Sequence, residues 1–234
     1  MLKTTKTLMA ASIVLGASAC FMATPVLAQG ASSVSLSANL SLVSDYRFRG
    51  ISLSDEDPAI QGGIDASLGG FYVGTWASSI EQVGNAETEI DLYGGYGGDI
   101  TDGLSYDVGF LYYTYPEGNG SNYYEVYGSL SGSVQLFNWT VGTAYAPDQN
   151  HLDFSQDGGS DDNLYVYGDG HVNIPDSPFY VGAHVGWEDG AFADNKIDWS
   201  GKLGVTYQMW DISVSYVDSD AGDAGVVFGV GAAF

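Results

Sequence analysis

Basic residues are almost absent from this chain of 234 residues, in which six Lys and Arg stand against 29 Asp and Glu. Lys3 and Lys6 lie at the extreme N-terminus, so the remaining four bases and 29 acids give the rest of the chain a formal charge of −25. A polyanion of this kind repels nucleic acid and anionic headgroups and attracts cations. We therefore predict no nucleic-acid partner.

Cysteine occurs once, at Cys20, and long apolar runs are absent after residue 28. The chain begins with Lys3 and Lys6, continues with the apolar stretch "LMAASIVLGASACFMA" and reaches the small-x-small step "VLA", which is the order of a secretory signal. We predict a cleaved signal peptide over residues 1–28 and a mature chain over residues 29–234 without disulfide or thiol chemistry. A retained membrane anchor and a lipoprotein modified at Cys20 are alternatives, which the short, interrupted apolar stretch and the "ASA" before Cys20 disfavour.

The mature chain is rich in Gly and Tyr and alternates with a period of two. In "LSANLSLVSDYRF" the apolar residues Leu36, Leu40 and Leu42 alternate with polar ones, and on a β-strand the two sets face opposite sides. The pattern recurs in 12 segments, of which residues 71–80 are the ambiguous member. Each is near the ~10 residues that a tilted strand needs to cross a bilayer. The sequence therefore predicts an all-β fold, an antiparallel transmembrane β-barrel of about 12 strands.

A soluble β-sandwich would also alternate, but two features favour the barrel. Bulky aromatic residues such as Tyr106, Trp199 and Trp210 gather at strand ends, as they do in the girdles at two membrane interfaces. The connections also alternate between short turns and longer acidic loops, as in outer-membrane barrels. We expect the following connections outside the cell: 50–58, 81–86, 116–121, 147–162, 188–195 and 218–224.

The only two arginines, Arg47 and Arg49, lie in the stretch "SDYRFRGIS". If the first strand continues through this stretch, Asp45, Arg47 and Arg49 face the lumen, while Tyr46 and Phe48 face lipid. The spacing of two keeps both guanidinium groups away from lipid, where each would cost ~2–4 kcal/mol near the midplane.

The same stretch carries a resemblance to a known family. Residues 40–78 contain a Ser-Asp-Tyr-x-x-x-Gly core, then Pro58 with Gln61-Gly62-Gly63, and a Tyr-x-Gly-x-Trp step ending at Trp76. This stretch resembles the N-terminal signature of the TorF-like porins of proteobacteria, and a looser likeness in strand pattern extends to the C-terminus. The resemblance implies an outer-membrane location and a pore, and it implies no catalytic or ligand residues.

Inward-facing charged and aromatic residues define the predicted lumen. We predict that the pore is lined by Asp45, Arg47, Arg49, Glu89, Asp91, Tyr113, Glu125, Tyr127, Tyr167, Asp169 and Lys202. Guanidinium groups opposite carboxylates would form a constriction with a transverse field, or they would merely neutralise buried acids in a plugged barrel. We predict an outer-membrane porin that passes small hydrophilic solutes and prefers cations; a structural or adhesive barrel is the alternative.

Enzymatic chemistry is not predicted. A lipase barrel, the rival class, would need a Ser-His pair with an orienting partner on one accessible face. Of the three histidines, His171 and His184 are expected to face the lumen and His151 lies in a loop. The stretch 153–163 partly matches a calcium loop but has Leu164 where a bidentate Glu is needed. We therefore predict no metal and no cofactor. The expected partners are outer-membrane lipid, lipopolysaccharide, the barrel-assembly machinery and an unidentified small solute.

Overall fold

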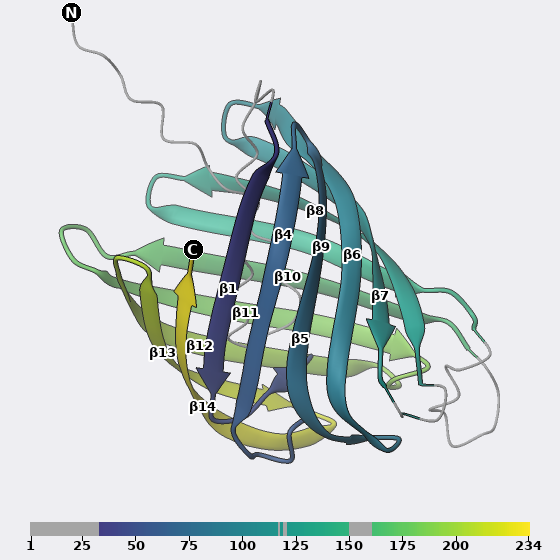
Figure 1. The fold of residues 1–234 in the computed structure, drawn as a ribbon. Helices are drawn as coiled ribbons and strands as arrows, with labels where there is room; N and C mark the ends of the chain where they lie inside the picture. Colours follow the sequence, from purple (N-terminus) through teal and green to yellow (C-terminus); the bar gives the residue numbers. More distant parts are fainter. Residues whose placement is uncertain (1–32, 117, 119–120, 150–160) are drawn as a thin grey trace, which may run out of the picture.

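The computed structural model describes residues 33–116, 118, 121–149 and 161–234 (Figure 1). The predicted signal peptide and most of the calcium-like stretch, residues 153–160, lie outside these ranges. Across the described ranges, no helix has the length and apolar character needed to cross a membrane.

Twelve strands of the described residues close into one antiparallel barrel. Their order around it is β1-β14-β13-β12-β11-β10-β9-β8-β7-β6-β5-β4. The barrel strands are β1 (Ser35–Val43), β4 (Ala59–Leu68), β5 (Phe71–Val83), β6 (Ala86–Thr101), β7 (Leu104–Thr114), β8 (Tyr123–Val134), β9 (Phe137–Ala146), β10 (Asn163–Asn173), β11 (Phe179–Gly190), β12 (Lys196–Tyr207), β13 (Trp210–Ser219) and β14 (Gly222–Ala233). Two short strands, β2 (Arg47–Phe48) and β3 (Ile51–Ser52), pair only with each other. The predicted barrel of about 12 strands is confirmed, and the ambiguous stretch 71–80 is part of β5.

The barrel closes between its first and last strands. β1 pairs with β14 from Asn39 opposite Ala233 to Val43 opposite Gly229, and Phe234 exchanges backbone hydrogen bonds of 3.2 and 2.9 Å with Ala38. Closure leaves no sheet edge whose backbone groups would be unpaired, which is the condition for a β-sheet to lie in lipid.

The outer wall of the barrel is apolar. Leu36, Leu40 and Leu42 of β1 are exposed, whereas Asn39 and Ser41 of the same strand are buried inside, so the alternation predicted for this strand is confirmed. Exposed aromatic side chains gather near one end of the barrel at Phe71, Tyr96, Phe137, Phe179, Tyr207, Trp210 and Phe234, and near the other at Tyr145, Trp199 and Tyr216. So much exposed apolar surface would not be stable in water and requires a lipid surrounding.

The two ends of the barrel differ in their connections. The end that holds Phe234, which we call the turn side, has short connections at 69–70, 102–103, 135–136, 174–178 and 208–209. The opposite end, the loop side, has the connections 44–58, 84–85, 115–122, 147–162, 191–195 and 220–221. Two expected long loops, 81–86 and 218–224, are wrong, because β5–β6 and β13–β14 extend into hairpins that close with two-residue turns.

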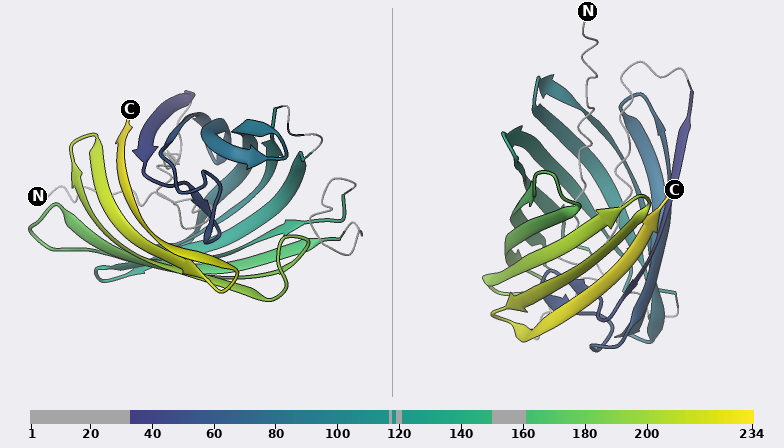
Figure 2. Two further views of the ribbon diagram at one scale, coloured as in Figure 1. Left: turned by 90° about the horizontal axis from the view of Figure 1, so that it is seen from below. Right: turned by 90° about the vertical axis from the view of Figure 1, so that its left-hand side faces the viewer.

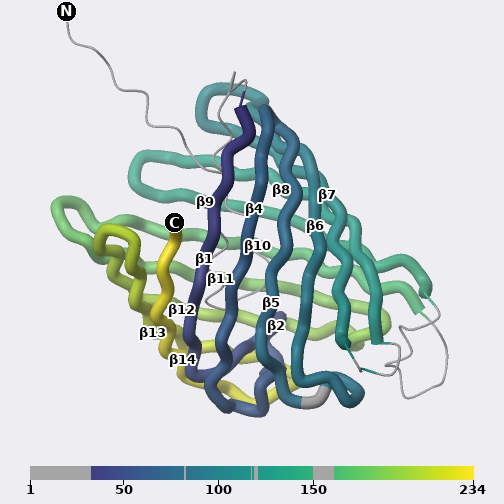
Figure 3. The backbone as a smooth tube through the Cα atoms, viewed as in Figure 1, coloured from purple at the N-terminus to yellow at the C-terminus, as the bar shows by residue number. Residues whose placement is uncertain are grey.

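The first strand is shorter than predicted. β1 ends at Val43, and residues 44–58, which we call the inner segment, turn back into the barrel before β4 begins (Figure 3). The view along the barrel in Figure 2 shows this segment inside the ring of strands. The prediction that Tyr46 and Phe48 face lipid is therefore wrong, because Tyr46 is buried and Phe48 packs against the same interior cluster.

Candidate functional site: the barrel lumen

The inner segment is fixed by backbone contacts to both neighbouring walls. The Ser44 N–H donates to the Phe228 carbonyl of β14 at 2.8 Å, and the Glu81 N–H of β5 donates to the Leu53 carbonyl at 2.7 Å. Between these contacts β2 and β3 form a small hairpin that places Arg49 and Gly50 at its tip. Gly50 has φ +86° and lies so close to Asp198 and Ser219 that an added Cβ would meet both at 2.8 Å. Only glycine fits this approach.

Arg49 forms the centre of a buried charge cluster. Its guanidinium contacts both carboxylate oxygens of Glu125 on β8 at 2.8 Å and Glu188 on β11 at 2.6 Å. Lys196 on β12 contacts Glu188 at 2.5 Å and donates to the Arg49 carbonyl at 2.7 Å. The guanidinium also lies 4.3 Å from the ring centroid of Tyr165, in the geometry of a cation–π contact.

The tip is therefore held by two acids, one base and an aromatic face. Arg49 is 1% exposed and Glu125 is fully buried. A charged group this deep is tolerated only with such partners.

Arg47 anchors the base of the inner segment. Its Nε lies 2.5 Å from Asp45, and its guanidinium donates to the carbonyls of Gly50 and Asp223 and lies 3.6 Å from Glu56. Asp45 also accepts a hydrogen bond of 2.6 Å from Ser52. Arg47 thus ties β2 to β3 and to the start of β14, and it does not reach across the lumen as Arg49 does.

Tyrosine hydroxyl groups donate to carboxylates around the lumen wall. The pairs are Tyr46 with Glu89 at 3.1 Å, Tyr72 with Asp107 at 2.7 Å, Tyr93 with Asp65 at 2.5 Å, Tyr113 with Glu125 at 3.0 Å, Tyr165 with Asp198 at 3.2 Å and Tyr180 with Asp211 at 2.9 Å. A neutral hydroxyl satisfies one oxygen of each acid without adding a positive charge. The lumen therefore keeps an acidic character.

Glycines make room for several of these rings. Tyr167 lies over Gly142 of the neighbouring strand so closely that a Cβ on Gly142 would meet the ring at 2.5 Å, and Tyr127 covers Gly109 in the same way. A ring that lies flat on a glycine takes little of the lumen cross-section. The joint abundance of Gly and Tyr in the sequence thus has a packing role here.

The turn-side half of the lumen contains a cavity of about 360 Å³, which Asp169, His171, His184, Lys202 and Asp211 help to line. His184 joins this cavity to the loop-side half. Its Nδ1 lies 2.7 Å from Asp169, and its Nε2 lies 3.1 Å from Asp198 and 2.8 Å from the Tyr165 hydroxyl. Within the described residues, no group of three or more His, Cys, Asp or Glu could hold a metal ion.

The structure brings most of the sequence-predicted lumen residues to the interior, in two separate groups. Asp45, Arg47, Arg49, Glu89, Asp91, Tyr113 and Glu125 are buried in and around the inner segment. Asp169 and Lys202 line the turn-side cavity, and Tyr127 and Tyr167 are half-buried. Arg49 and Lys202 therefore do not share one constriction.

Two important residues were missed. Glu188 was assigned to an external acidic loop but is buried and paired with Arg49, and Lys196 was not considered. The signal was available, because Glu188 and Lys196 continue the inward parity of His184 and Lys202 along β11 and β12. Glu87, which shares the parity of Glu89 on β6, is exposed at the loop-side end of the strand.

A closed twelve-stranded barrel with an apolar exterior and a charged interior defines the class of outer-membrane porin folds, and solved structures agree. The chain is similar to the KdgM porin, with 13% identity, a TM-score of 0.60 and coverage of 85% of this chain and 99% of that one. It is also similar to the NanC porin, with 13% identity, a TM-score of 0.58 and coverage of 86% and 99%. An outer-membrane channel from Pseudomonas putida F1 matches at 6% identity, with a TM-score of 0.54 and coverage of 87% and 97%. At such identities these likenesses establish the fold.

Residues 27–231 match the model of a family described as a bacterial protein of unknown function, Gcw_chp, and the chain belongs to this family. A comparison with curated proteins gives no match. The more specific likeness to TorF-like porins stays a prediction.

Proposed function

We propose that this protein is an outer-membrane porin that gives small hydrophilic solutes passive passage through its lumen. The observation that supports the proposal is the difference between the two faces of the barrel wall. Apolar side chains cover the outer face, while charged and hydroxyl-bearing side chains cover the inner face. A barrel that served only as a membrane anchor would have no need for so many interior charges, each of which is costly to bury.

We further propose that the pore prefers cations. Nine acids are buried inside, namely Asp45, Asp65, Glu89, Asp91, Asp107, Glu125, Glu188, Asp198 and Asp211. The buried Arg and Lys residues are three, Arg47, Arg49 and Lys196. Half-buried Asp169 and Lys202 add one charge of each sign. A surplus of acids in a narrow lumen raises the local concentration of cations.

The solute need not match that of the structural neighbours. KdgM has also been solved with a disordered oligogalacturonate, which is a chain of acidic sugars. The acidic lumen described above would repel such a polyanion. We therefore propose that this porin accepts neutral or cationic solutes and rejects polyanionic ones.

A barrel without an open pore is the second candidate, and the burial of the inner segment favours it. Arg49, Glu125 and Tyr113 fill the loop-side half of the lumen and are almost wholly inaccessible to solvent. Movement of the inner segment would separate an open state from this closed one, so the two candidates differ in whether that movement occurs.

Conductance distinguishes the two candidates. The full mature chain, refolded and inserted in a planar bilayer, should show discrete channel openings, and a potassium chloride gradient should give a reversal potential of the sign for cation selectivity. Absence of openings in preparations that still shift on a gel after boiling would support the closed barrel. Anion selectivity at low salt would contradict the charge argument.

We propose that the barrel lies in the outer membrane, in contact with lipid and lipopolysaccharide, after insertion by the barrel-assembly machinery. The exposed aromatic bands and the exposed terminal Phe234 support this location. Fractionation of cells with a tagged mature chain tests it, and recovery in the soluble periplasm would refute it.

A further inference from the structure

One wall of the lumen concentrates polar atoms that have no hydrogen-bond partner. Nine buried side-chain nitrogen and oxygen atoms among the described residues lack a partner, and six of them belong to Asn39, Asp65, Trp76, Glu89 and Asp91. These residues lie on β1, β4, β5 and β6, which are adjacent in the barrel. Buried polar groups are normally satisfied, so a cluster of exceptions requires an explanation.

The atoms without a partner include both donors and acceptors. Asn39 has neither its Nδ2 nor its Oδ1 satisfied, and the Trp76 Nε1 has no acceptor. Both side chains are at least nine-tenths buried. They meet over Gly63 of the strand between them, where an added Cβ would lie 3.1 Å from Asn39 Nδ2 and 3.3 Å from Trp76 Cδ1.

Asp65, Glu89 and Asp91, the three acids of this wall, take no part in the ion pairs that Arg47, Arg49 and Lys196 form. The ion pairs of Arg47, Arg49 and Lys196 use Asp45, Glu56, Glu125 and Glu188. Glu89 and Asp91 are two residues apart on β6 and both are buried on its inward face, and two carboxylates in that arrangement repel each other unless a proton or a cation lies between them.

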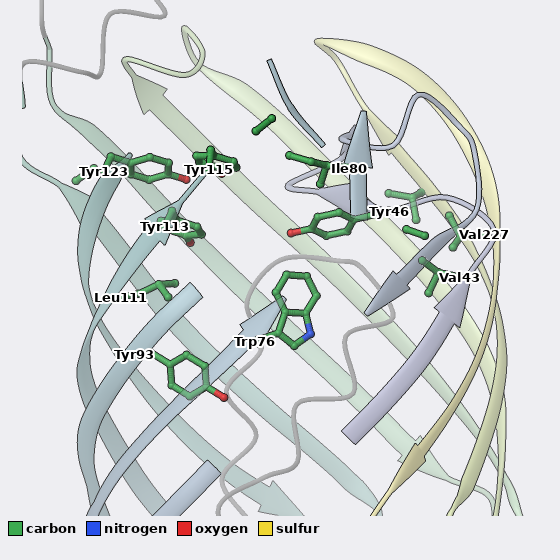
Figure 4. Packing of buried hydrophobic residues seen from close by; sticks show 14 of the residues in the cluster. Val43, Tyr46, Trp76, Ile80, Tyr93, Leu111, Tyr113, Tyr115, Tyr123 and Val227 are labelled. Carbon is green, nitrogen blue, oxygen red and sulfur yellow. The ribbon is translucent and has the colours of Figure 1, made fainter. Parts of the chain in front are cut away.

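The inner segment contacts Trp76 and Glu89 of this wall through Tyr46. Tyr46 donates from its hydroxyl to Glu89 at 3.1 Å and lies edge-on to Trp76, with ring centroids 5.5 Å apart (Figure 4). Tyr46 thus supplies a hydrogen-bond donor and an apolar face but no positive charge. A ligand with a hydrogen-bond donor, an apolar face and a positive charge would give partners to more of the polar and acidic groups of this wall than Tyr46 does.

The covering conformation depends on tertiary contacts. Arg49, Asp55 and Glu56 have φ of 48°, 53° and 64°, a region that non-glycine residues adopt at a cost. The segment therefore stays inside because Arg49 and Tyr46 bind the barrel wall. On this side a competing ligand would have to replace the contacts of Tyr46 and outlast the backbone hydrogen bond from Glu81 to Leu53.

We propose that Asn39, Asp65, Trp76, Glu89 and Asp91 form a binding site for a small hydroxylated organic ammonium ion, which takes the place of Tyr46 when the inner segment withdraws. The ammonium would lie between Glu89 and Asp91, and its hydroxyl groups would meet Asn39, Asp65 and the Trp76 N–H. The Trp76 ring would pack against the ligand carbons and the cation. This inference rests on the proposed function, because it requires that solutes enter the lumen.

Calorimetric titration of the refolded full mature chain in detergent micelles, at low salt and pH 6, tests the site. The probes are glucosamine, whose amine is protonated at this pH, and glucose, its neutral counterpart. Glucosamine should bind at least about tenfold more tightly than glucose. The variant Glu89→Gln with Asp91→Asn should lose this preference, whereas Glu87→Gln, an exposed acid on the same strand, should keep it.

Gel shift on boiling confirms that each variant has folded, and Asp91→Asn alone replaces the double variant if that one does not fold. Absence of glucosamine binding, equal binding of both sugars, or binding unchanged in the folded acid variants would overturn the proposal and would indicate a carboxyl pair that shares a proton. Titration needs no ion flow, so a barrel that binds glucosamine but conducts nothing would refute the porin function alone. A barrel that conducts ions but does not bind glucosamine would refute only this site.

Discussion

Replacing Arg49 with Ala tests whether the inner segment is held in the lumen by charge. The guanidinium makes two buried ion pairs, with Glu125 at 2.8 Å and Glu188 at 2.6 Å. Glu188 keeps Lys196 in the variant, whereas the partner left to Glu125 among the described residues is the hydroxyl of Tyr113. Removing one partner of a buried pair costs about 3–5 kcal/mol, and we assign this cost chiefly to the stranded Glu125.

The cost should fall on the inner segment and leave the barrel intact. The twelve-stranded ladder closes through β1 and β14 without any contribution from β2 or β3, so the segment can detach while the barrel remains folded. About 3 kcal/mol corresponds to roughly a hundredfold in an equilibrium constant. We expect the Leu53 amide, which donates to the Tyr46 carbonyl at 2.7 Å, to exchange its hydrogen at least about a hundredfold faster.

The assay is hydrogen exchange on the refolded barrel, combined with bilayer conductance on the same preparation. Arg49→Ala should speed exchange in residues 44–58 and increase conductance, because the loop-side half of the lumen is vacated. Adding Glu125→Gln to this variant should recover part of the protection, since the unpaired charge is removed. Lys202→Ala, which removes a base from the turn-side cavity, should leave exchange in the segment unchanged.

Three results would refute this reasoning. Unchanged exchange in residues 44–58 would show that Arg49 does not hold the segment. Faster exchange with unchanged conductance would show that the segment does not obstruct the path. A large loss of stability of the whole barrel, without faster exchange confined to the segment, would assign Arg49 a purely structural role.

Three further predictions concern the wall, the terminus and the ionic strength. Gly142→Val should push the Tyr167 ring off the wall and lower conductance, whereas Gly168→Val, at a site with no atom within 4 Å of an added Cβ, should conduct normally; equal conductance of the two would contradict the packing role. Deletion of Phe234 should reduce the fraction of chain that reaches the heat-modifiable barrel form, measured by gel shift, because its backbone pairs with Ala38 at the closing seam. Cation preference in reversal-potential measurements should weaken between 0.1 M and 1 M salt, where the Debye length falls from ~10 to ~3 Å; a preference independent of salt would argue against a field effect.

The sequence alone determined the barrel and most of its faces. Alternation with a period of two is a local property of each strand, because successive side chains of an extended chain must point to opposite sides. That property placed Leu36 outside and Glu89, Asp91, Tyr113 and Glu125 inside, and it predicted the number of strands. The same parity, continued from His184 and Lys202 to the loop-side ends of β11 and β12, would also have placed Glu188 and Lys196.

Only the tertiary structure determines which way the chain runs at "SDYRFRGIS". Tyr46 and Phe48 fit the lipid-facing parity of a continuing strand, and nothing local ends the strand at Val43. The chain turns inward because Arg49 finds Glu125 and Glu188, which lie 76 and 139 residues away in the sequence, and because Tyr46 finds Trp76 and Glu89 on β5 and β6. Contacts of such separation exist only once the barrel has closed, so no pattern within the stretch itself could have predicted them.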